Sequence, residues 1–204
     1  SPISIFNEAN GLKGSCLSVF RHKGRLHAGT IQGIFRLASK KRFYYEEHEA
    51  GAARPRFTPI TGCTLSCWNF LSQDDRLFAG CGDGIFEVRG NEAIGNKYNG
   101  SIGTVYCFGR SKRFPHYIFL GRQEGLAWIE ISPDNSLKNG MFRVRARGAF
   151  PSIPVTIRKI VSDEEGNLWL TSNVKGIYHI RFQGNDKNND IENHQVFRYG
   201  TEHG

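Results

Sequence analysis

Residues 77–86 read Leu77-Phe78-Ala79-Gly80-Cys81-Gly82-Asp83-Gly84-Ile85-Phe86, two apolar runs separated by small residues and glycines. Glycine readily adopts the positive φ that a tight turn requires, so this pattern predicts two antiparallel strands joined by a short turn. The same pattern recurs at residues 26–35, 119–128 and 168–178. The last turn glycine falls at positions 33, 84, 125 and 176, which gives spacings of 51, 41 and 51 residues.

Each of these strand pairs is flanked by further strand-like segments. Apolar stretches precede the pairs at residues 16–20, 65–71, 104–108 and 155–161, and fourth strands are predicted at Phe43–Glu46, Met141–Arg147 and Gln195–Tyr199. Four short antiparallel strands that recur at this period are typical of a β-propeller blade. We therefore predict an all-β fold, a β-propeller fragment of about four four-stranded antiparallel blades at residues 14–46, 63–98, 103–147 and 154–199.

The two ends of the chain show the same part of the repeat. Ile3–Phe6 and Val196–Tyr199 both have the form of an outer strand, and a closed ring of four blades has room for only one of them. We therefore predict that residues 1–12 hold the outer strand of a preceding blade and that residues 1–204 are part of a larger propeller. Unpaired blade faces would be apolar and would favour self-association. The alternative is a closed four-bladed ring with one terminal strand unpaired.

Composition fits a folded, turn-rich protein with a basic surface. The 204 residues include 24 glycines and 12% aromatic residues, and the net charge is +8 with a pI of about 9.4. The basic excess lies in residues 1–60 and 141–160, where we expect a solvated surface, with contact to a polyanion as the alternative. We expect no nucleic-acid binding, because the basic residues are not interleaved with aromatic residues in a recognisable motif. No apolar run approaches the about 18 residues of a membrane span, so we expect membrane attachment only through other parts of a longer protein.

The cysteines do not predict a metal site. The chain has five of them, at positions 16, 63, 67, 81 and 107. Cys63-x-x-x-Cys67 lacks a second Cys or His pair at zinc-finger spacing, so a structural zinc is not expected. Free cysteine is among the most buried residue types, and we expect these side chains to be buried. The sequence leaves open whether any of them pair, and therefore also the compartment.

The fourth repeat carries a family resemblance. Residues 163–172, Asp-Glu-Glu-Gly-Asn-Leu-Trp-Leu-Thr-Ser, followed by Gly176-Ile177-Tyr178, resemble the two-component-regulator propeller repeat, whose pattern is an acidic turn, Gly-Asn-Leu-Trp, an aliphatic residue, Gly-Thr and Gly-Leu-Tyr. Thr171 stands where that family usually has glycine, and the third repeat departs further, with Arg122 after Gly121. A sialidase-type Asp-box is excluded, because Ser162 and Asp163 are adjacent.

What the resemblance implies is a fold and a setting. Such repeats usually build seven or more blades, in the extracytoplasmic (periplasmic) sensor region of hybrid two-component sensor kinases. The resemblance implies a non-catalytic module that binds a signal, often a carbohydrate, and passes the change to a kinase or other output domain elsewhere in the protein. Two alternatives stay open, a protein–protein interaction scaffold and a propeller glycosidase or lyase.

Propellers commonly bind ligands where blade loops converge at one rim. The turns after the innermost strands place basic side chains there: Arg21, His22, Lys23, Arg110, Lys112 and Arg113. On the innermost strands, Trp68 and Tyr106 can offer faces for sugar stacking, with core packing as the alternative reading. These eight residues are the predicted ligand-binding set, and an oligosaccharide or an acidic molecule is the predicted ligand.

A second candidate lies on the outer strand of the third blade. Arg143, Arg145 and Arg147 alternate, which predicts three guanidinium groups on one strand face and an anion site, or else a solvated basic face. No catalytic residue, metal ligand or cofactor is predicted. Glu46-Glu47-His48-Glu49 falls in a polar link, and Asp74-Asp75 and Asp163-Glu164-Glu165 fall where turns favour such residues.

Overall fold

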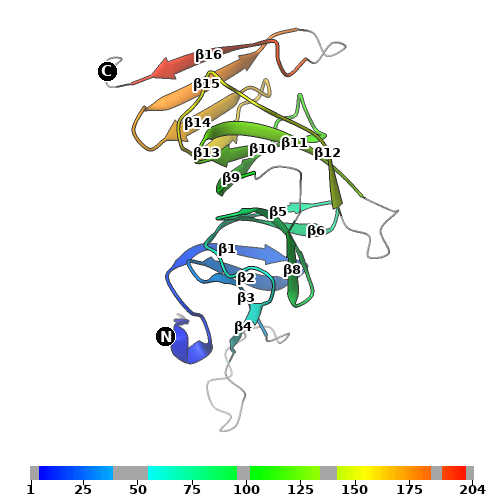
Figure 1. The fold of residues 1–204 in the computed structure, drawn as a ribbon, viewed down its shortest axis with the longest axis vertical. Coiled ribbons are helices and arrows are strands. Elements are labelled where there is room, and N and C mark those ends of the chain that lie inside the picture. Colours follow the sequence, from blue (N-terminus) through cyan, green and yellow to red (C-terminus); the bar gives the residue numbers. More distant parts are fainter. Residues whose placement is uncertain (1–4, 39–54, 96–101, 134–141, 185–189, 201–204) are drawn as a thin grey trace. The chain divides into compact units, whose positions relative to one another are not determined.

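The computed structural model describes residues 5–38, 55–95, 102–133, 142–184 and 190–200. These residues form four four-stranded antiparallel sheets in which strands that follow one another in sequence lie side by side (Figure 1). We name the sheets blades 1 to 4 in chain order. Blades 1 and 2 contain β1 (Cys16–His22), β2 (Arg25–Thr30), β3 (Gly33–Leu37), β4 (Phe57–Ile60), β5 (Cys67–Gln73), β6 (Arg76–Cys81), β7 (Gly84–Arg89) and β8 (Glu92–Gly95). Blades 3 and 4 contain β9 (Val105–Gly109), β10 (Tyr117–Arg122), β11 (Gly125–Pro133), β12 (Phe142–Ala149), β13 (Ile157–Ser162), β14 (Leu168–Ser172), β15 (Ile177–Phe182) and β16 (His194–Tyr199).

The predicted all-β fold of four four-stranded blades is confirmed. Tight turns occur where the sequence pattern placed them. Lys23 and Gly24 between β1 and β2, and Asp74 and Asp75 between β5 and β6, all have positive φ. Two consecutive residues with positive φ are the signature of a type I′ hairpin turn, whose twist matches that of the flanking strands.

The fourth strand of blade 1 was predicted wrongly. It is β4, Phe57–Ile60, whereas the predicted segment Phe43–Glu46 lies outside the described residues. Phe57 and Ile60 are both buried and pair with Leu37 and Ile34 of β3. Pro59 lacks a backbone N–H, and it is tolerated here because an outermost strand leaves one edge unpaired. Blade 1 therefore extends to Ile60 and not to residue 46.

The segment before blade 1 also differs from its prediction. Half of the predicted outer strand Ile3–Phe6 lies outside the described part, and residues 5–12 contain a short 3₁₀ helix, η1 (Glu8–Asn10), and no strand. The Asn7 side chain accepts a hydrogen bond from the backbone N–H of Ala9, and Gly11 ends the helix with φ 82°. Phe6 packs edge-on against Phe57, with ring centres 5.4 Å apart. This segment therefore covers part of blade 1 without adding a strand to it.

Backbone contacts divide the chain into two compact units. The first unit contains residues Ser1–Gly82 and Phe86–Gly95, and the second contains Asp83–Ile85 and Asn96–Gly204. Blades 1 and 2 pack together in the first unit, where β5 lies against β1 and β2. Blades 3 and 4 pack together in the second unit, where β13 lies against β9 and β10. Each unit therefore contains one complete blade–blade joint.

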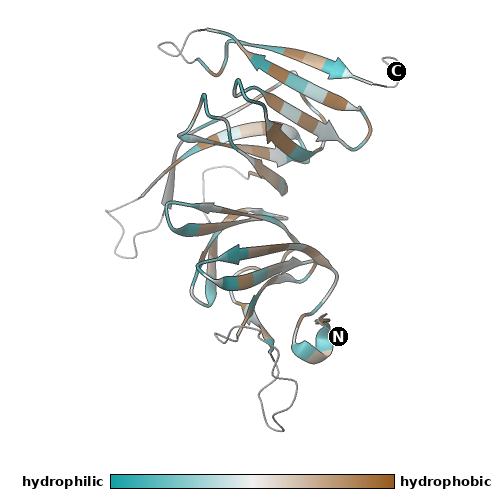
Figure 2. Ribbon diagram, turned by 180° about the vertical axis from the view of Figure 1, so that it is seen from behind, coloured by the Kyte–Doolittle hydropathy of each residue, from teal (hydrophilic) through white to brown (hydrophobic). Residues whose placement is uncertain are grey.

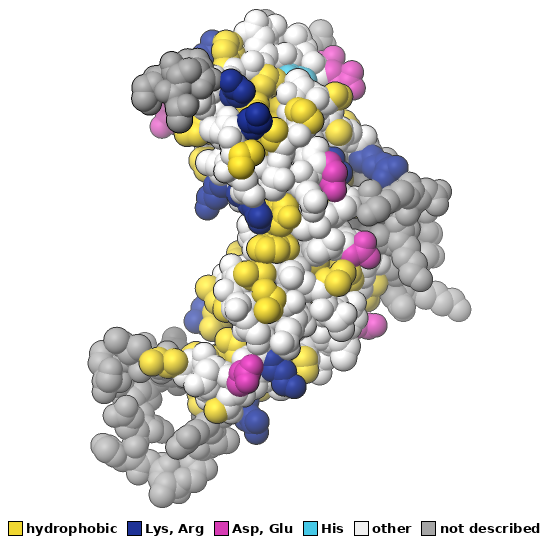
Figure 3. All heavy atoms as spheres, turned by 60° about the vertical axis from the view of Figure 1, so that its left-hand side comes forward, with side chains coloured by type: hydrophobic (Ala, Val, Ile, Leu, Met, Phe, Trp, Pro, Cys, Tyr) yellow, Lys and Arg dark blue, Asp and Glu magenta, His cyan; other side chains and the backbone are white. Residues whose placement is uncertain are grey.

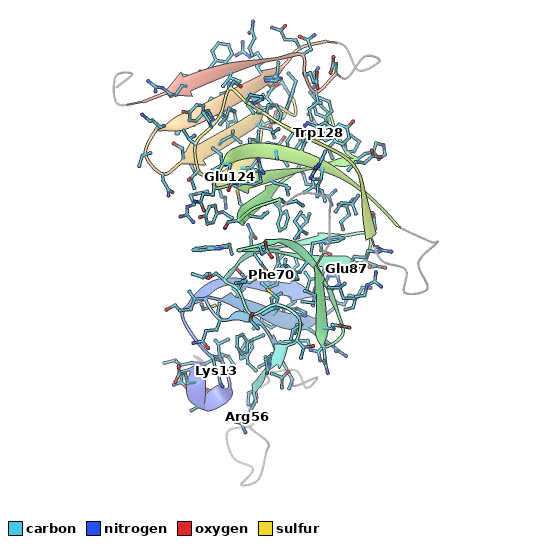
Figure 4. All side chains as sticks on the ribbon, in the orientation of Figure 1. Lys13, Arg56, Phe70, Glu87, Glu124 and Trp128 are labelled. Atoms are coloured by element: carbon cyan, nitrogen blue, oxygen red, sulfur yellow. The ribbon has the colours of Figure 1, made fainter. Side chains whose placement is uncertain are left out.

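Both joints have a core of side chains from the two facing sheets. In the first unit, Phe70 of β5 lies between the sheets, 6.1 Å from the Phe20 ring and 6.3 Å from the His27 ring (Figure 4). In the second unit, Phe119 of blade 3 packs against Phe182 of blade 4 in a larger aromatic cluster. Figure 2 shows hydrophobic and hydrophilic residues mixed along β15 and β16, without strict alternation. In β15 three consecutive residues, 178–180, are buried, and because successive side chains of a strand point to opposite faces, both faces of this strand are covered.

Candidate functional site

The predicted rim residues of the first unit hold the two blades together. The Nδ1 atom of His22 lies 3.0 Å from the hydroxyl oxygen of Ser72 in blade 2. Lys23 and Asp75 form an exposed ion pair at 3.8 Å between the two type I′ turns, and Arg21 donates to the carbonyl of Gly24 within its own turn. Trp68 is half-buried near the start of β5, at the opposite end of that strand from the turn. The structure therefore groups Arg21, His22 and Lys23 but does not bring Trp68 to them.

In the second unit, the turn between β9 and β10 carries the other predicted cations. Arg110 and Lys112 are exposed. Arg113 instead reaches blade 4, where its guanidinium donates to the carbonyls of Phe182 and Gly184, both at 2.6 Å. Ser111 donates to the carbonyl of Gly166, also in blade 4. Arg113 therefore ties two blades together, a role that its position in a polar turn did not reveal.

A groove lies beside this turn and is the strongest candidate ligand site of the rim. It has a volume of about 360 Å³, and its lining residues are Arg113, Phe114, Pro115, His116, Tyr117 and Glu130. The Tyr117 ring lies between Phe114, 5.9 Å away, and Trp128, 4.5 Å away. A cation, an imidazole, a carboxylate and an aromatic ring thus line one concave surface of the size that takes a small ligand. The sequence analysis did not name His116, Tyr117 or Glu130. Tyr117 and Glu130 lie on the neighbouring strands β10 and β11, and only the pairing of these strands brings them together.

Tyr106 does not offer the open face that the sequence suggested. The guanidinium of Arg158 in blade 4 lies 3.8 Å above the centre of its ring. Arg158 also donates to the side-chain oxygen of Asn173, 3.0 Å away. A cation over an aromatic face is a stabilising contact that removes this face from ligand stacking. In this position Tyr106 contributes to the joint between blades 3 and 4.

The predicted arginine series lies on β12, whose backbone register against β11 is irregular. Arg147 pairs with Ile129 and Arg143 pairs with Ser132, but the register shifts between Glu130 and Ile131, so Arg145 has no partner directly opposite. Arg147 is exposed, and the side chains of Arg143 and Arg145 lie outside the described part of the structure. The anion site remains a prediction.

The far face of blade 4, the side turned away from blade 3, carries a row of aromatic and aliphatic side chains. Trp169 of β14 stacks on His179 of β15 at 3.9 Å, with Tyr199 of β16 on the other side at 5.8 Å. Trp169, Tyr199, Ile177 and Val161 are 37%, 41%, 44% and 53% exposed. A groove of about 640 Å³ borders this face beside the β13–β14 turn and is lined by Arg113, Asp163, Glu165, Asn167, Trp169, His179, Arg181 and Phe182. Trp169 and His179 are direct cross-strand partners, so strand register could have predicted their contact.

Asp163 explains the acidic turn of the fourth repeat. Its carboxylate accepts hydrogen bonds from the backbone N–H and the side-chain amide of Asn167, at 2.8 and 3.2 Å. Burial raises the pKa of this carboxyl, but these bonds and one from the Trp169 indole outweigh burial and hold the pKa below its usual value. Asn167 in turn accepts a hydrogen bond from the backbone N–H of Phe182. The carboxylate therefore closes a turn, which is the structural role that the sequence analysis favoured.

Charged side chains are dispersed on the one face of the molecule that Figure 3 draws. On the face drawn in Figure 3, Lys and Arg side chains lie in separate groups among exposed hydrophobic side chains. Within the described ranges, no cluster of three or more His, Cys, Asp or Glu residues is arranged to hold a metal ion. The same residues contain no helix long and apolar enough to span a membrane.

Comparison with known proteins places the fold. No protein-family model matches the chain, and no curated protein matches it in sequence. Among solved structures, the chain resembles the extracellular domain of BT4673 from B. thetaiotaomicron, described in one structure as a one-component system and in another as a hybrid two-component system. The TM-scores are 0.56 and 0.55 at 13% and 12% identity, over 91% of this chain. The extracellular domain of the hybrid two-component system BT3049 from the same organism aligns over 80% of this chain at 20% identity, with a TM-score of 0.48.

This similarity establishes the fold. The chain shares its fold with the BT4673 extracellular domain, and its four four-stranded antiparallel sheets have the blade form that the two-component-regulator resemblance predicted. The chain spans about a fifth of those solved domains, 21% of their length.

Proposed function

We propose that this chain is a non-catalytic, ligand-sensing part of the extracytoplasmic propeller region of a two-component type regulator. The observation that carries the proposal is the fold, which follows the extracellular domain of BT4673 over 91% of this chain. The Gly-Asn-Leu-Trp motif at residues 166–169 supports the same assignment, because its Asn167 and the neighbouring Asp163 build the turn of the repeat. A regulator of this kind would place the chain outside the cytoplasm, with its output domain elsewhere in the protein.

The rim groove of blade 3 is the ligand site that fits this function best. His116 and Glu130 provide hydrogen-bonding groups in this groove, beside Tyr117, whose ring is packed between Phe114 and Trp128, and Arg113, whose guanidinium donates to two carbonyls of blade 4. A concave site with several polar groups of this kind can bind the hydroxyl groups of a sugar. Arg110 and Lys112, both exposed on the adjoining turn, favour an oligosaccharide that carries acidic groups. The described groove contains a single carboxylate, Glu130, whereas a typical glycosidase uses two.

A glycan array followed by calorimetry tests this function. The purified chain is screened against acidic and neutral oligosaccharides, and any binder is measured with His116→Ala and Arg110→Met variants. Both side chains are exposed, so neither change should affect folding. We expect each variant to weaken binding about tenfold, the loss of one charge-assisted hydrogen bond. Arg21→Met, in the rim turn of the first unit, is the matched control and should bind as the unchanged chain does.

Two results would contradict the assignment. Binding that is weakened equally by Arg21→Met would place the ligand elsewhere. Release of reducing sugar from a bound oligosaccharide would replace a sensing role by a catalytic one.

A second candidate function, as an interaction module, is favoured by the far face of blade 4. Trp169 occupies the position in blade 4 that His27 occupies in blade 1 and Phe119 in blade 3. It lies seven residues before the last turn glycine, and His27 and Phe119 lie six residues before theirs, because their turns are one residue shorter. Those two side chains are buried against the following blade, His27 against Phe70 and Phe119 against Phe182. The side chains around Trp169 therefore occupy positions that pack against the following blade in blades 1 and 3. We propose that a further four-stranded blade covers them, and in a solution of this chain alone only a second copy can supply that blade.

Sedimentation velocity over a roughly hundredfold range of concentration measures this association. We expect concentration-dependent dimers that Ile177→Lys weakens at least tenfold, because the variant places a charge in the middle of the apolar row. Val174→Lys is the control, since Val174 is more exposed still but lies in the β14–β15 turn and not on the sheet face. A chain that stays monomeric at every concentration, or a dimer that Val174→Lys weakens equally, would contradict this second function.

A further inference from the structure

We propose that Cys63 and Cys81 form a reversible disulfide bond by exchange with an external disulfide, while Cys67 remains a thiol beside them. Their sulfur atoms are 3.3 Å apart, and both thiols are free and buried in the core of the first unit. A disulfide bond is about 2.05 Å long, so the sulfurs have to approach by roughly 1.3 Å. This is a small movement, because Cys63 lies in the link between β4 and β5 and not in a strand.

Cys67 is the competing partner, and its position disfavours it. Cys67 and Cys81 are directly opposite each other in β5 and β6, next to a register shift. Strand pairing fixes both of their backbones, whereas the backbone of Cys63 can adjust. The Cys63 thiol donates to the Cys81 sulfur across 3.3 Å, whereas the Cys67 thiol, which also interacts with Cys81, has an acceptor of its own in the carbonyl of Asn69.

The second unit shows that packing alone does not require cysteines at these positions. A Cβ atom at Gly33 would lie 2.4 Å from the carbonyl oxygen of Cys63, and one at Gly125 would lie 2.1 Å from that of Ile153. Cys63 and Ile153 are therefore equivalent in the two joints. By the same comparison at Gly29 and Gly121, Cys67 is equivalent to Ile157.

Strand pairing gives the residue of the second joint that is equivalent to Cys81. Ile157 pairs with Ser172 as Cys67 pairs with Cys81, so Cys81 is equivalent to Ser172. One joint fills these positions with two fully buried isoleucines and a serine, and the other fills them with three cysteines. The cysteine cluster is thus a specific feature of the first unit.

A small-molecule disulfide is a sufficient oxidant for forming this bond. The thiolate of one cysteine attacks the oxidant, forms a mixed disulfide and releases one thiol. The thiolate of the second cysteine then attacks the protein sulfur of the mixed disulfide, and the second thiol leaves. Two protons pass from the cysteines to the released thiols, and the oxidant is reduced by two electrons. The hydrogen bond with Cys81 and burial both raise the pKa of the Cys63 thiol, so the exchange is slow in the folded chain and faster during folding.

Closing this bond would fix the joint of the first unit. Cys63 abuts Gly33 of blade 1, and Cys81 belongs to the second strand of blade 2. The disulfide would therefore fasten the link that enters blade 2 to the interior of that blade. The consequence is a joint whose stability depends on the redox state of its surroundings.

Peptide mapping tests the bond directly. The purified chain is refolded from urea with reduced and oxidised glutathione, treated with iodoacetamide and digested with trypsin without reduction. We expect tryptic peptide 57–76, which holds Cys63 and Cys67, to be joined to peptide 77–89, which holds Cys81, with one carbamidomethyl group on Cys67. Reduction should lower the midpoint of thermal unfolding by about 5–10 °C, as expected for a loop of this size.

Matched variants separate this bond from its alternatives. Cys63→Ile copies the residue of the second joint and should fold, but it should abolish the linked peptide and the redox-dependent shift in unfolding temperature. Cys67→Ile should retain both. A link through Cys67, or complete alkylation of Cys63 and Cys81 after refolding with oxidant, would overturn the proposal. Neither readout depends on where the protein resides or on what it binds.

Discussion

The two blade–blade joints share their backbone contacts and differ in their side chains. In the first unit Gly29 and Gly33 lie against the carbonyls of Cys67 and Cys63, and in the second Gly121 and Gly125 lie against those of Ile157 and Ile153. Ser66 donates to the carbonyl of Ile31 just as Thr156 donates to that of Gln123. At equivalent positions around this common frame, the first joint has His27 and three cysteines where the second has Phe119, two isoleucines and a serine. The approach of two blades is therefore set by glycines and main-chain carbonyls, and the remaining positions are free to diverge.

Breaking the common frame should have the largest effect. Gly125 has φ +120°, and a Cβ atom there would lie 2.1 Å from the carbonyl oxygen of Ile153. Gly125→Ala combines a strained backbone with a clash against main chain that cannot move aside, and we expect it to lower the free energy of unfolding by about 3 kcal/mol or more. Gly33→Ala, with the same φ and a 2.4 Å approach to Cys63, should cost a similar amount. Urea unfolding followed by circular dichroism measures both.

Gly24→Ala is the control for this pair. Gly24 also has positive φ, but nothing lies within 4 Å of a Cβ atom placed there. Its cost should be about 1 kcal/mol, the strain of a left-handed conformation alone. If Gly125→Ala cost no more than Gly24→Ala, the close approach of the blades would not be what these glycines provide.

The second prediction concerns the histidine that only one joint contains. Burial, together with the charge of Arg36, lowers the pKa of His27 to about 4, although a backbone hydrogen bond at Arg25 acts in the opposite direction. Below pH about 6.5 the unfolded chain binds a proton at this side chain that the folded chain does not bind until about pH 4. Stability should thus be fully present above pH 6.5 and fall by roughly 3 kcal/mol as the pH drops to 4. Urea unfolding between pH 7 and pH 4 measures this loss.

Replacement by the residue of the other joint isolates the histidine. His27→Phe places phenylalanine where Phe119 stands in blade 3, and it should remove this part of the pH dependence. Leu26→Phe, a substitution beside His27 that removes no titratable group, is the control for the change of side-chain volume. An unchanged slope in His27→Phe would mean that another group titrates in this pH range.

The sequence predicted the blades because their signals are local. Gly33, Gly84, Gly125 and Gly176 mark the turns, and the apolar runs beside them must be strands if the pattern repeats. The strand β4 was missed because a long polar segment separates it from β3 and because Pro59 is a poor strand signal. Its position depends on pairing with β3, which no local pattern reveals.

The candidate site was less predictable, because its groups meet through distant contacts. Arg113 was placed correctly in a turn, but its carbonyl partners at Phe182 and Gly184 are about 70 residues away in the chain. Tyr106 was placed on an innermost strand, but the cation that covers it comes from the next blade. A turn or strand assignment gives a residue's location within a blade, and not what the neighbouring blade brings to it.

The smallest effect on stability is expected at the arginine that each joint uses to donate hydrogen bonds to the neighbouring blade. Arg113 donates to two carbonyls of blade 4, and Arg36 donates to the carbonyl of Gly90 and the side chain of Asn91 in blade 2. Replacing either by methionine keeps the apolar stem and leaves a carbonyl without its donor, so each should lower the free energy of unfolding by about 1–2 kcal/mol in urea titrations. Arg110→Met, at an exposed side chain, should change it by less than about 0.5 kcal/mol. If Arg113→Met changed the free energy of unfolding as little as Arg110→Met does, while Arg36→Met lowered it, Arg113 would not be needed to hold the two blades together. Its guanidinium would then be available to a ligand in the rim groove.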